Sequence, residues 1–283
     1  MKSLQTNLSW VFFGTDYFAV KVLETLSQNN LKPGLIVTTP DTPQGRHLTL
    51  TPPPVKLWAE KNKIPFLQPI KLSEARLNDA VGQASEALEA IPLFLVASYG
   101  KIIPEKVFNL PKHGTLNIHP SLLPKYRGAS PIQSAILNGD SETGVTIMMI
   151  DKEVDHGAIV AQDTLALNGE ETFENLRDSL AKLGAGLFTK ILPDWLDGKI
   201  EAKEQNHTKA TFTKKIEKKD GEIKLTDDPI INYRKFRALS PKPGIYFFDT
   251  SGKRVKIKQA KLENRNFVPT RIIPEGEKEQ DWK

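Results

Sequence analysis

The sequence predicts an α/β protein in which a mostly parallel sheet with flanking helices is followed by a small β-barrel. Near the N-terminus, strand-sized apolar runs at 8–13 and 35–38 enclose a segment with helical spacing of apolar residues. A third run, Pro92–Ala97, is apolar throughout, which is typical of a parallel strand buried on both faces. Beyond residue 211, short β-like pieces alternate with Pro, Gly and Asp turns, and this spacing favours a small antiparallel barrel.

Length and composition fit this two-part organisation. The chain has 283 residues, 39% of them hydrophobic, which is enough to bury the cores of one large domain and one smaller domain. We expect a first domain over residues 1–196, a polar linker over 197–210 and a second domain over 211–283. The absence of cysteine excludes disulfides, thiolate catalysis and cysteine metal sites. Met1–Trp10 lacks the features of a signal peptide, so we expect a cytoplasmic protein without a membrane segment.

Positive charge is concentrated toward the C-terminus. Residues 206–283 contain 19 Lys and Arg against 11 Asp and Glu, whereas the preceding residues contain 20 against 23. A clustered basic surface is the usual electrostatic mark of a nucleic-acid partner. The alternative is that these lysines are only the solvated face of a small domain.

The chain opens with a strand, a turn and a helix. The first strand ends at Gly14, and Asp16 is placed as the N-cap of the helix that follows. Because no Gly-x-Gly-x-x-Gly is present, this opening has a Rossmann-like topology without the dinucleotide fingerprint, and NAD is not implied. From Pro40 to Pro54, five prolines predict a long irregular loop that carries Arg46 and His47.

Helical and strand patterns continue through the first domain. They predict helices over Val55–Asn62, Leu72–Leu88, Ile132–Leu137 and Thr172–Leu192, and strands over Ile64–Leu67, Gly144–Met149 and Ala158–Ala161. Tyr99 and Gly100 follow the buried strand at its C-terminal end, where ligands bind in open α/β sheets. They are therefore candidates for a pocket wall.

The second domain combines short strands with one helix. The strands are expected at Ile223–Leu225, Ile245–Phe248 and Val255–Ile257, and the helix at Tyr233–Leu239. Arg234 and Arg237 lie on this helix, and we expect both side chains to be exposed.

The stretch from Gly114 to Pro131 carries the most polar chemistry. Leu116 and Ile118 alternate with Asn117 and His119, so a strand there would place the two polar side chains on one face. An amide and an imidazole in that arrangement can both donate to a carbonyl oxygen that becomes anionic, as acyl transfer requires. The alternative is a polar strand face that meets solvent.

This stretch resembles the signature of the folate-dependent formyltransferases. The matching residues are Asn117-Ile-His119-Pro-Ser121-Leu-Leu-Pro124, Tyr126-Arg127-Gly128 and Ser130-Pro131-Ile132-Gln133. The form is similar to family members that act on methionyl-tRNA. The resemblance implies transfer of a formyl group from 10-formyltetrahydrofolate to initiator methionyl-tRNA, for translation initiation. This reaction requires no metal, and we expect a monomer. It also implies that the second domain is a shortened, OB-like, tRNA-binding domain.

The resemblance also implies roles for individual residues. Asn117 would be a neutral donor to the oxyanion, His119 a donor most useful when protonated, and Asp155 the carboxylate that keeps His119 charged and relays the proton through water. The folate would contact Ser121, Leu122, Leu123, Pro124, Tyr99 and Gly100. The tRNA would contact Arg46, His47, Lys56, Arg234 and Arg237.

Several alternatives remain at this level. Asp151 or Glu153 could be the relevant acid in place of Asp155, and the ring of His156 could compete for Asp155. The histidines are scattered and have no metal-ligand spacing. A sugar-nucleotide N-formyltransferase, a formyltetrahydrofolate hydrolase and a catalytically silent folate- or RNA-binding protein are the alternative functions.

Overall fold

The computed structural model describes residues 10–45, 48–77 and 91–282. The chain forms two compact units, and each consists of segments that are distant in the sequence. Unit 1 comprises Met1–Pro124, Gly144–Asp163 and Asp178–Ala210, and unit 2 comprises Lys125–Thr143, Thr164–Arg177 and Thr211–Lys283.

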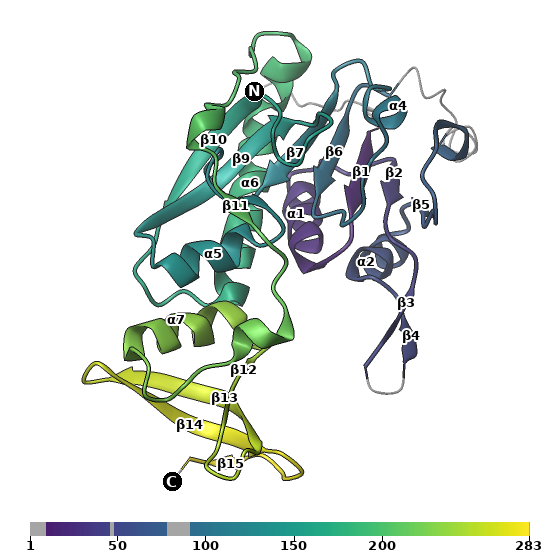
Figure 1. Cartoon of the computed structure of the whole chain (residues 1–283). Helices are drawn as coiled ribbons and strands as arrows, with labels where there is room; N and C mark the ends of the chain where they lie inside the picture. Colours follow the sequence, from purple (N-terminus) through teal and green to yellow (C-terminus); the bar gives the residue numbers. More distant parts are fainter. Residues whose placement is uncertain (1–9, 46–47, 78–90, 283) are drawn as a thin grey trace. The chain divides into compact units, whose positions relative to one another are not determined.

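The centre of unit 1 is a seven-stranded sheet with the order β10-β9-β7-β6-β1-β2-β5 (Figure 1). Strands β1, β2, β5, β6 and β7 run parallel, and β9 pairs with β7 in the antiparallel direction. Their bounds are Val11–Gly14 for β1, Leu35–Val37 for β2, Phe66–Leu67 for β5, Phe94–Ala97 for β6, Thr115–His119 for β7, Glu142–Met149 for β9 and Ile159–Ala166 for β10. The predicted mostly parallel sheet is confirmed.

Three helices of this part of the chain were predicted from their apolar spacing: α1 (Tyr17–Gln28), α2 (Pro54–Asn62) and α6 (Phe173–Leu196). The short helix α4 (Glu105–Phe108) was not predicted. Asp16 caps α1 by accepting from the backbone N–H groups of Phe18 and Ala19, as the sequence predicts. The predicted helix over Leu72–Leu88 falls largely on 78–90, outside the described residues.

A hairpin replaces the irregular loop that the prolines predict between Pro40 and Pro54. Strand β3 (Thr42–Gln44) pairs antiparallel with β4 (Thr49–Thr51). Pro43 lies inside β3, which pairs only with β4 among the described residues. Its edge position therefore accommodates a residue without a backbone N–H. Arg46 and His47 lie outside the described residues.

Unit 2 contains a four-stranded antiparallel sheet in the order β12-β13-β14-β15 (Figure 1). Its strands are Ile245–Phe248, Arg254–Glu263, Asn266–Pro274 and Gln280–Asp281, and the helix α7 covers Pro229–Leu239. The unit also contains α5 (Pro131–Asn138), the short parallel pair β8 (Arg127–Gly128) and β11 (Phe212–Thr213), and the 3-10 turn η3 (Lys218–Gly221). Residues 223–225 were predicted as a strand but do not form one. The neighbouring Glu222 forms an isolated β-bridge with Tyr246. Closure of the sheet into a barrel stays a prediction.

The segment expected to be a linker, 197–210, belongs to unit 1. Lys203 and Ile159 exchange both backbone hydrogen bonds, at 2.7 and 2.8 Å, and Gln205 is buried. The 3-10 turn η2 (His207–Lys209) follows. This segment therefore packs on the first unit, while the domain boundaries we derived from the sequence stay a prediction. Among the described residues, no helix is long and apolar enough to cross a membrane.

Candidate active site

Strand β7 brings Asn117 and His119 to the C-terminal part of the parallel sheet. Asn117 pairs with Val96 on β6 and Met148 on β9, and His119 pairs with Thr146 on β9. Because alternate residues of a strand share a face, the two polar side chains lie on the same side of the sheet. His119 is 4% exposed and Asn117 is half-buried, so their hydrogen bonds operate where water is largely excluded.

Asp155 lies next to His119. Its Oδ1 is 3.5 Å from His119 Nδ1, and the two side chains are 14% and 5% exposed respectively. This separation allows an ion pair when the imidazole is protonated, and it is longer than a short hydrogen bond. The structure therefore brings together the three residues predicted as catalytic.

The other two acids considered from the sequence have different surroundings. Asp151 Oδ2 is 2.7 Å from His156 Nδ1, while the side chain of Glu153 is 73% exposed. His156 also stacks on His207, with ring centroids 4.0 Å apart. The carboxylate beside His119 is thus that of Asp155, and His156 pairs with Asp151.

The turn that carries Asp155 has an unusual backbone. Asp155 has a φ of +50°, in the left-handed region that non-glycine residues rarely adopt. A Cβ on Gly157 would collide with the carbonyl oxygen of Met149, so only glycine fits there without movement. Gln205 donates from Nε2 to the carbonyl oxygens of Asp155, at 2.9 Å, and Gly157, at 2.8 Å.

The segment Ser121–Pro124 follows β7 and is held by one hydroxyl group. Thr146 Oγ1, which is fully buried, donates to the carbonyl of Ser121 and accepts from the backbone N–H of Leu123 and from Gln162 Nε2, at 2.7 to 3.0 Å. The hydroxyl thereby uses its donor and both lone pairs. Thr146 and Gln162 were missed from the sequence, although Thr146 lies within a predicted strand.

Tyr99 lies in the core. Its side chain is 3% exposed, it contacts Phe13 edge-to-face with ring centroids 5.5 Å apart, and its hydroxyl has no partner among the described residues. Burial raises the pKa of Tyr99 to about 12. Gly100 is exposed with a φ of +75°. Any contribution of Tyr99 to a ligand site would come from its backbone, because its ring packs in the core.

Lys56 makes an ion pair at the base of the β3-β4 hairpin. Its Nζ is 2.7 Å from Asp41 Oδ2, and Gln68 Nε2 donates to Oδ1 of the same carboxylate. The hydrogen bond from Gln68, followed by that from Lys56, holds the pKa of Asp41 below its usual value. The positive charge of Lys56 is therefore compensated by the negative charge of Asp41.

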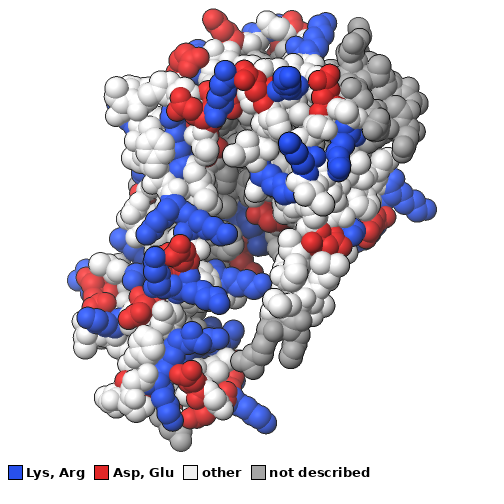
Figure 2. Space-filling view, turned by 45° about the vertical axis from the view of Figure 1, so that its right-hand side comes forward, with Lys and Arg blue, Asp and Glu red and all other residues white. Residues whose placement is uncertain are grey.

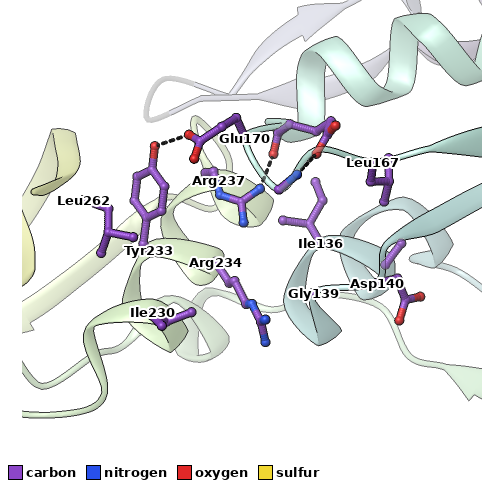
Figure 3. Close-up of a pocket in the computed structure, with 13 residues that line it drawn as sticks. Ile136, Gly139, Asp140, Leu167, Glu170, Ile230, Tyr233, Arg234, Arg237 and Leu262 are labelled. Carbon is purple, nitrogen blue, oxygen red and sulfur yellow. Dashed lines mark hydrogen bonds between the residues drawn. The ribbon is translucent and has the colours of Figure 1, made fainter. Parts of the chain in front are cut away.

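Arg234 and Arg237 line a pocket of about 140 Å³ within unit 2 (Figure 3). The expectation that Arg237 is exposed was wrong, because it is 6% exposed and donates from Nη1 to the carbonyl of Glu171 at 2.8 Å. Its guanidinium also lies over the ring of Tyr233, which donates to Glu170. Arg234 is half-buried and reaches the carbonyl of Asn138.

The C-terminal strands carry exposed positive charge. Figure 2 shows Lys and Arg side chains over the lower part of the view, with Asp and Glu scattered among them. The exposed basic residues of this sheet and its turns include Lys253, Lys256, Lys258, Lys261 and Arg265. Within the described ranges, no group of three or more His, Asp or Glu could hold a metal ion.

Comparison with known proteins gives matches over both parts of the chain. Residues 8–192 match the family described as "Formyl transferase", and residues 215–278 match "Formyl transferase, C-terminal domain". The methionyl-tRNA formyltransferase of Sulfurihydrogenibium sp. is 40% identical over 273 residues, which are 95% of this chain and 86% of that relative. The methionyl-tRNA formyltransferase of Thermotoga maritima is 42% identical over 240 residues, 84% of this chain and 74% of that relative.

Solved structures show the same fold at lower sequence identity. A 4-N formyltransferase from Francisella tularensis has a TM-score of 0.65 and 22% identity, covering 90% of this chain and 98% of that one. The methionyl-tRNA formyltransferase from Clostridium thermocellum has a TM-score of 0.61 and 16% identity, covering 94% and 98%. This chain thus shares its overall fold with solved formyltransferases.

Proposed function

Because this chain belongs to the formyl transferase family, we propose that it transfers the formyl group of 10-formyltetrahydrofolate to the free amino group of initiator methionyl-tRNA. The observation that carries the proposal is the convergence of Asn117, His119 and Asp155 at one end of β7 in a chain about 40% identical to enzymes named for that reaction. The enzyme would act as a monomer in the cytoplasm, where translation starts.

The reaction sets three chemical demands on the site. The attacking amine must be unprotonated, the formyl oxygen must be stabilised as it becomes anionic, and the leaving folate nitrogen must gain a proton. Asn117 supplies an uncharged N–H donor from the strand. His119 supplies a second donor, which is stronger when the ring is protonated. Asp155, at 3.5 Å from the ring, relays the proton lost by the amine through water to the leaving folate nitrogen.

The formyl donor would lie along Ser121–Pro124. The hydrogen bonds to Thr146 fix the backbone of this segment, and Leu122 and Pro124 are half-buried beside it. A fixed backbone edge with apolar side chains suits an aromatic pterin ring, whose amide edge needs hydrogen bonds and whose faces need apolar contacts. Gly100 is proposed to border the same site.

The tRNA would contact basic residues of both units. We assign Arg46 and His47, which follow β3 in the sequence, and Lys56 to this contact, together with Arg234 and the exposed lysines of the C-terminal sheet. Arg237 keeps a supporting role, because its guanidinium already binds a backbone carbonyl. Binding through phosphates should weaken steeply as salt is raised.

The deciding experiment is formylation by the purified protein with 10-formyltetrahydrofolate and a panel of acceptors. We expect formyl-methionyl-tRNA from methionyl-tRNA and no transfer to amino-sugar nucleotides. Transfer only to an amino sugar would assign the chain to the sugar enzymes, and release of formate without an acceptor would indicate a hydrolase. Salt-sensitive tRNA binding without any turnover would indicate a silent binding protein.

A further inference from the structure

We propose that Gln205 is a positioning residue for the reaction: its buried amide holds the turn that presents Asp155 to His119. This inference rests on the proposed function, because Asp155 is catalytic only if formyl transfer occurs here. Gln205 is 4% exposed, and its Nε2 donates to the carbonyl oxygens of Asp155 at 2.9 Å and Gly157 at 2.8 Å. It therefore binds the backbone carbonyls of the two residues that flank His156.

The turn needs such support because its own conformation is unfavourable. The left-handed φ of Asp155 is disfavoured for a residue with a Cβ, so surrounding contacts must maintain it. A buried carbonyl without a partner is strongly disfavoured, and Gln205 donates to the buried carbonyl of Gly157 and to the partly buried carbonyl of Asp155. If both hydrogen bonds were lost, the turn could relax toward an ordinary conformation, and the Asp155 carboxylate would leave its position 3.5 Å from His119.

The segment that carries Gln205 is itself anchored. Lys203 exchanges two backbone hydrogen bonds with Ile159. On the other side, Asn206 caps η2 by accepting from the backbone N–H and the hydroxyl of Thr208, and the ring of His207 lies parallel to that of His156. The Gln205 amide thus extends from a backbone segment that is itself held by hydrogen bonds, so it can keep the Asp155 turn in place.

The chemistry of the contact requires an amide of this length. Two carbonyl oxygens accept, so the side chain must donate twice from one nitrogen, and a glutamine NH₂ group does this. A glutamate of the same shape would present lone pairs to both carbonyls and repel them. An asparagine is one methylene shorter and would not reach both oxygens from the same backbone position.

The test compares Gln205→Glu, Gln205→Leu and Gln205→Asn with the parent enzyme. Gln28→Glu and Gln28→Leu are matched controls, because Gln28 is exposed at the end of α1. We expect Gln205→Glu to lower kcat by roughly 10- to 100-fold, since a displacement of about 1 Å at a catalytic group can cost that much. The KM for methionyl-tRNA and for 10-formyltetrahydrofolate should stay within about twofold, and the control variants should match the parent.

A double-variant comparison separates positioning from general structural damage. If Gln205 acts through Asp155, adding Gln205→Glu to Asp155→Ala should lower kcat by less than about twofold, because the group that it positions is already gone. An equal loss in the presence and absence of Asp155 would overturn the proposal. So would a Gln205→Glu enzyme with the kcat of the parent.

Hydrogen exchange gives a readout that does not depend on activity. In Gln205→Glu, we expect faster exchange confined to the amides of residues 151–159, while the rest of the sheet keeps its protection. Unchanged exchange in this turn, or loss of protection throughout unit 1, would overturn the positioning role. If the parent made no formyl-methionyl-tRNA, the proposed function would fail while the exchange result would still decide whether Gln205 holds the turn.

Discussion

His119 Nδ1 lies 3.5 Å from Asp155 Oδ1, although one residue belongs to a strand and the other to a turn. His119 ends β7, whereas Asp155 lies in the turn beyond β9, which is the antiparallel neighbour of β7. The antiparallel register places the C-terminal end of β7 opposite the interior of β9, so the turn after β9 has to come back toward the imidazole. In this turn, a Cβ on Gly157 would collide with the carbonyl oxygen of Met149, and the carbonyl of Asp155 accepts from Gln205.

Replacing Asp155 tests this relationship directly. We expect Asp155→Asn to lower kcat for formyl-methionyl-tRNA formation by roughly 100-fold or more, because the amide places no charge beside His119 and cannot accept a proton. The matched control is Asp151→Asn, since Asp151 belongs to the same loop and pairs with His156. A comparable loss in Asp151→Asn would transfer the catalytic role to that carboxylate.

Asn117 should act through its N–H donor alone. We expect Asn117→Ala to lower kcat by about 100- to 1,000-fold, the usual consequence of losing one oxyanion donor, with little change in KM. Asn117→Asp has nearly the same shape but no N–H group, so it should lose as much. An Asn117→Asp enzyme that retained most of its turnover would show that this position serves only to shape the site.

The placement of Asn117 and His119 on one strand could be predicted because the pattern is local. Alternation of apolar and polar residues in β7 is enough to place Asn117 and His119 on one face, and the cap at Asp16 is equally local. Asp155 was reached only through resemblance to a family, since an isolated Asp in a turn has no distinguishing pattern.

The features missed from the sequence depend on contacts between distant segments. Gln205 lies in a polar stretch that reads as a linker, and its burial follows from the pairing of Lys203 with Ile159. Arg237 is charged and was expected in solvent, but it is buried and donates to the carbonyl of Glu171, a contact that no local pattern reveals. Neither burial could be predicted from composition or periodicity.

The two arginines of α7 should separate stability from tRNA binding. We expect Arg237→Met to lower the free energy of unfolding by about 1–3 kcal/mol, because the partly buried carbonyl of Glu171 loses its donor. Its affinity for tRNA should be nearly unchanged. Urea unfolding and filter binding at several salt concentrations would measure the two effects.

Arg234→Met is the matched comparison on the same helix. Its contact with the carbonyl of Asn138 is longer, at 3.3 Å, so its loss should cost less stability than that of Arg237. If Arg234 contacts a phosphate, its replacement should weaken tRNA binding and reduce the slope of log K against log salt by about 1. The reverse pattern, with tRNA binding lost in Arg237→Met alone, would contradict our assignment.

Tyr99 should make the protein less stable in alkali. Its pKa is raised to about 12 by burial, above the ordinary value of 10.0, so the folded state keeps the phenol proton after the unfolded state has lost it. The contribution of Tyr99 is therefore complete below pH 10 and is lost between pH 10 and about 12, at roughly 1.4 kcal/mol per pH unit. Urea unfolding at pH 9, 10 and 11 measures the slope.

The Tyr99→Phe variant separates the stability lost through ionisation of Tyr99 from the stability lost as lysines titrate in the same pH range. The variant lacks the ionisable hydroxyl, so its stability should fall less between pH 10 and 11 than that of the parent. At pH 7 it should be as stable as the parent or slightly more so, because the buried hydroxyl has no partner among the described residues. Tyr17→Phe, at an exposed position, should behave like the parent at every pH. Equal alkaline slopes for the parent and Tyr99→Phe would mean that the Tyr99 hydroxyl ionises as easily in the folded state as in the unfolded one.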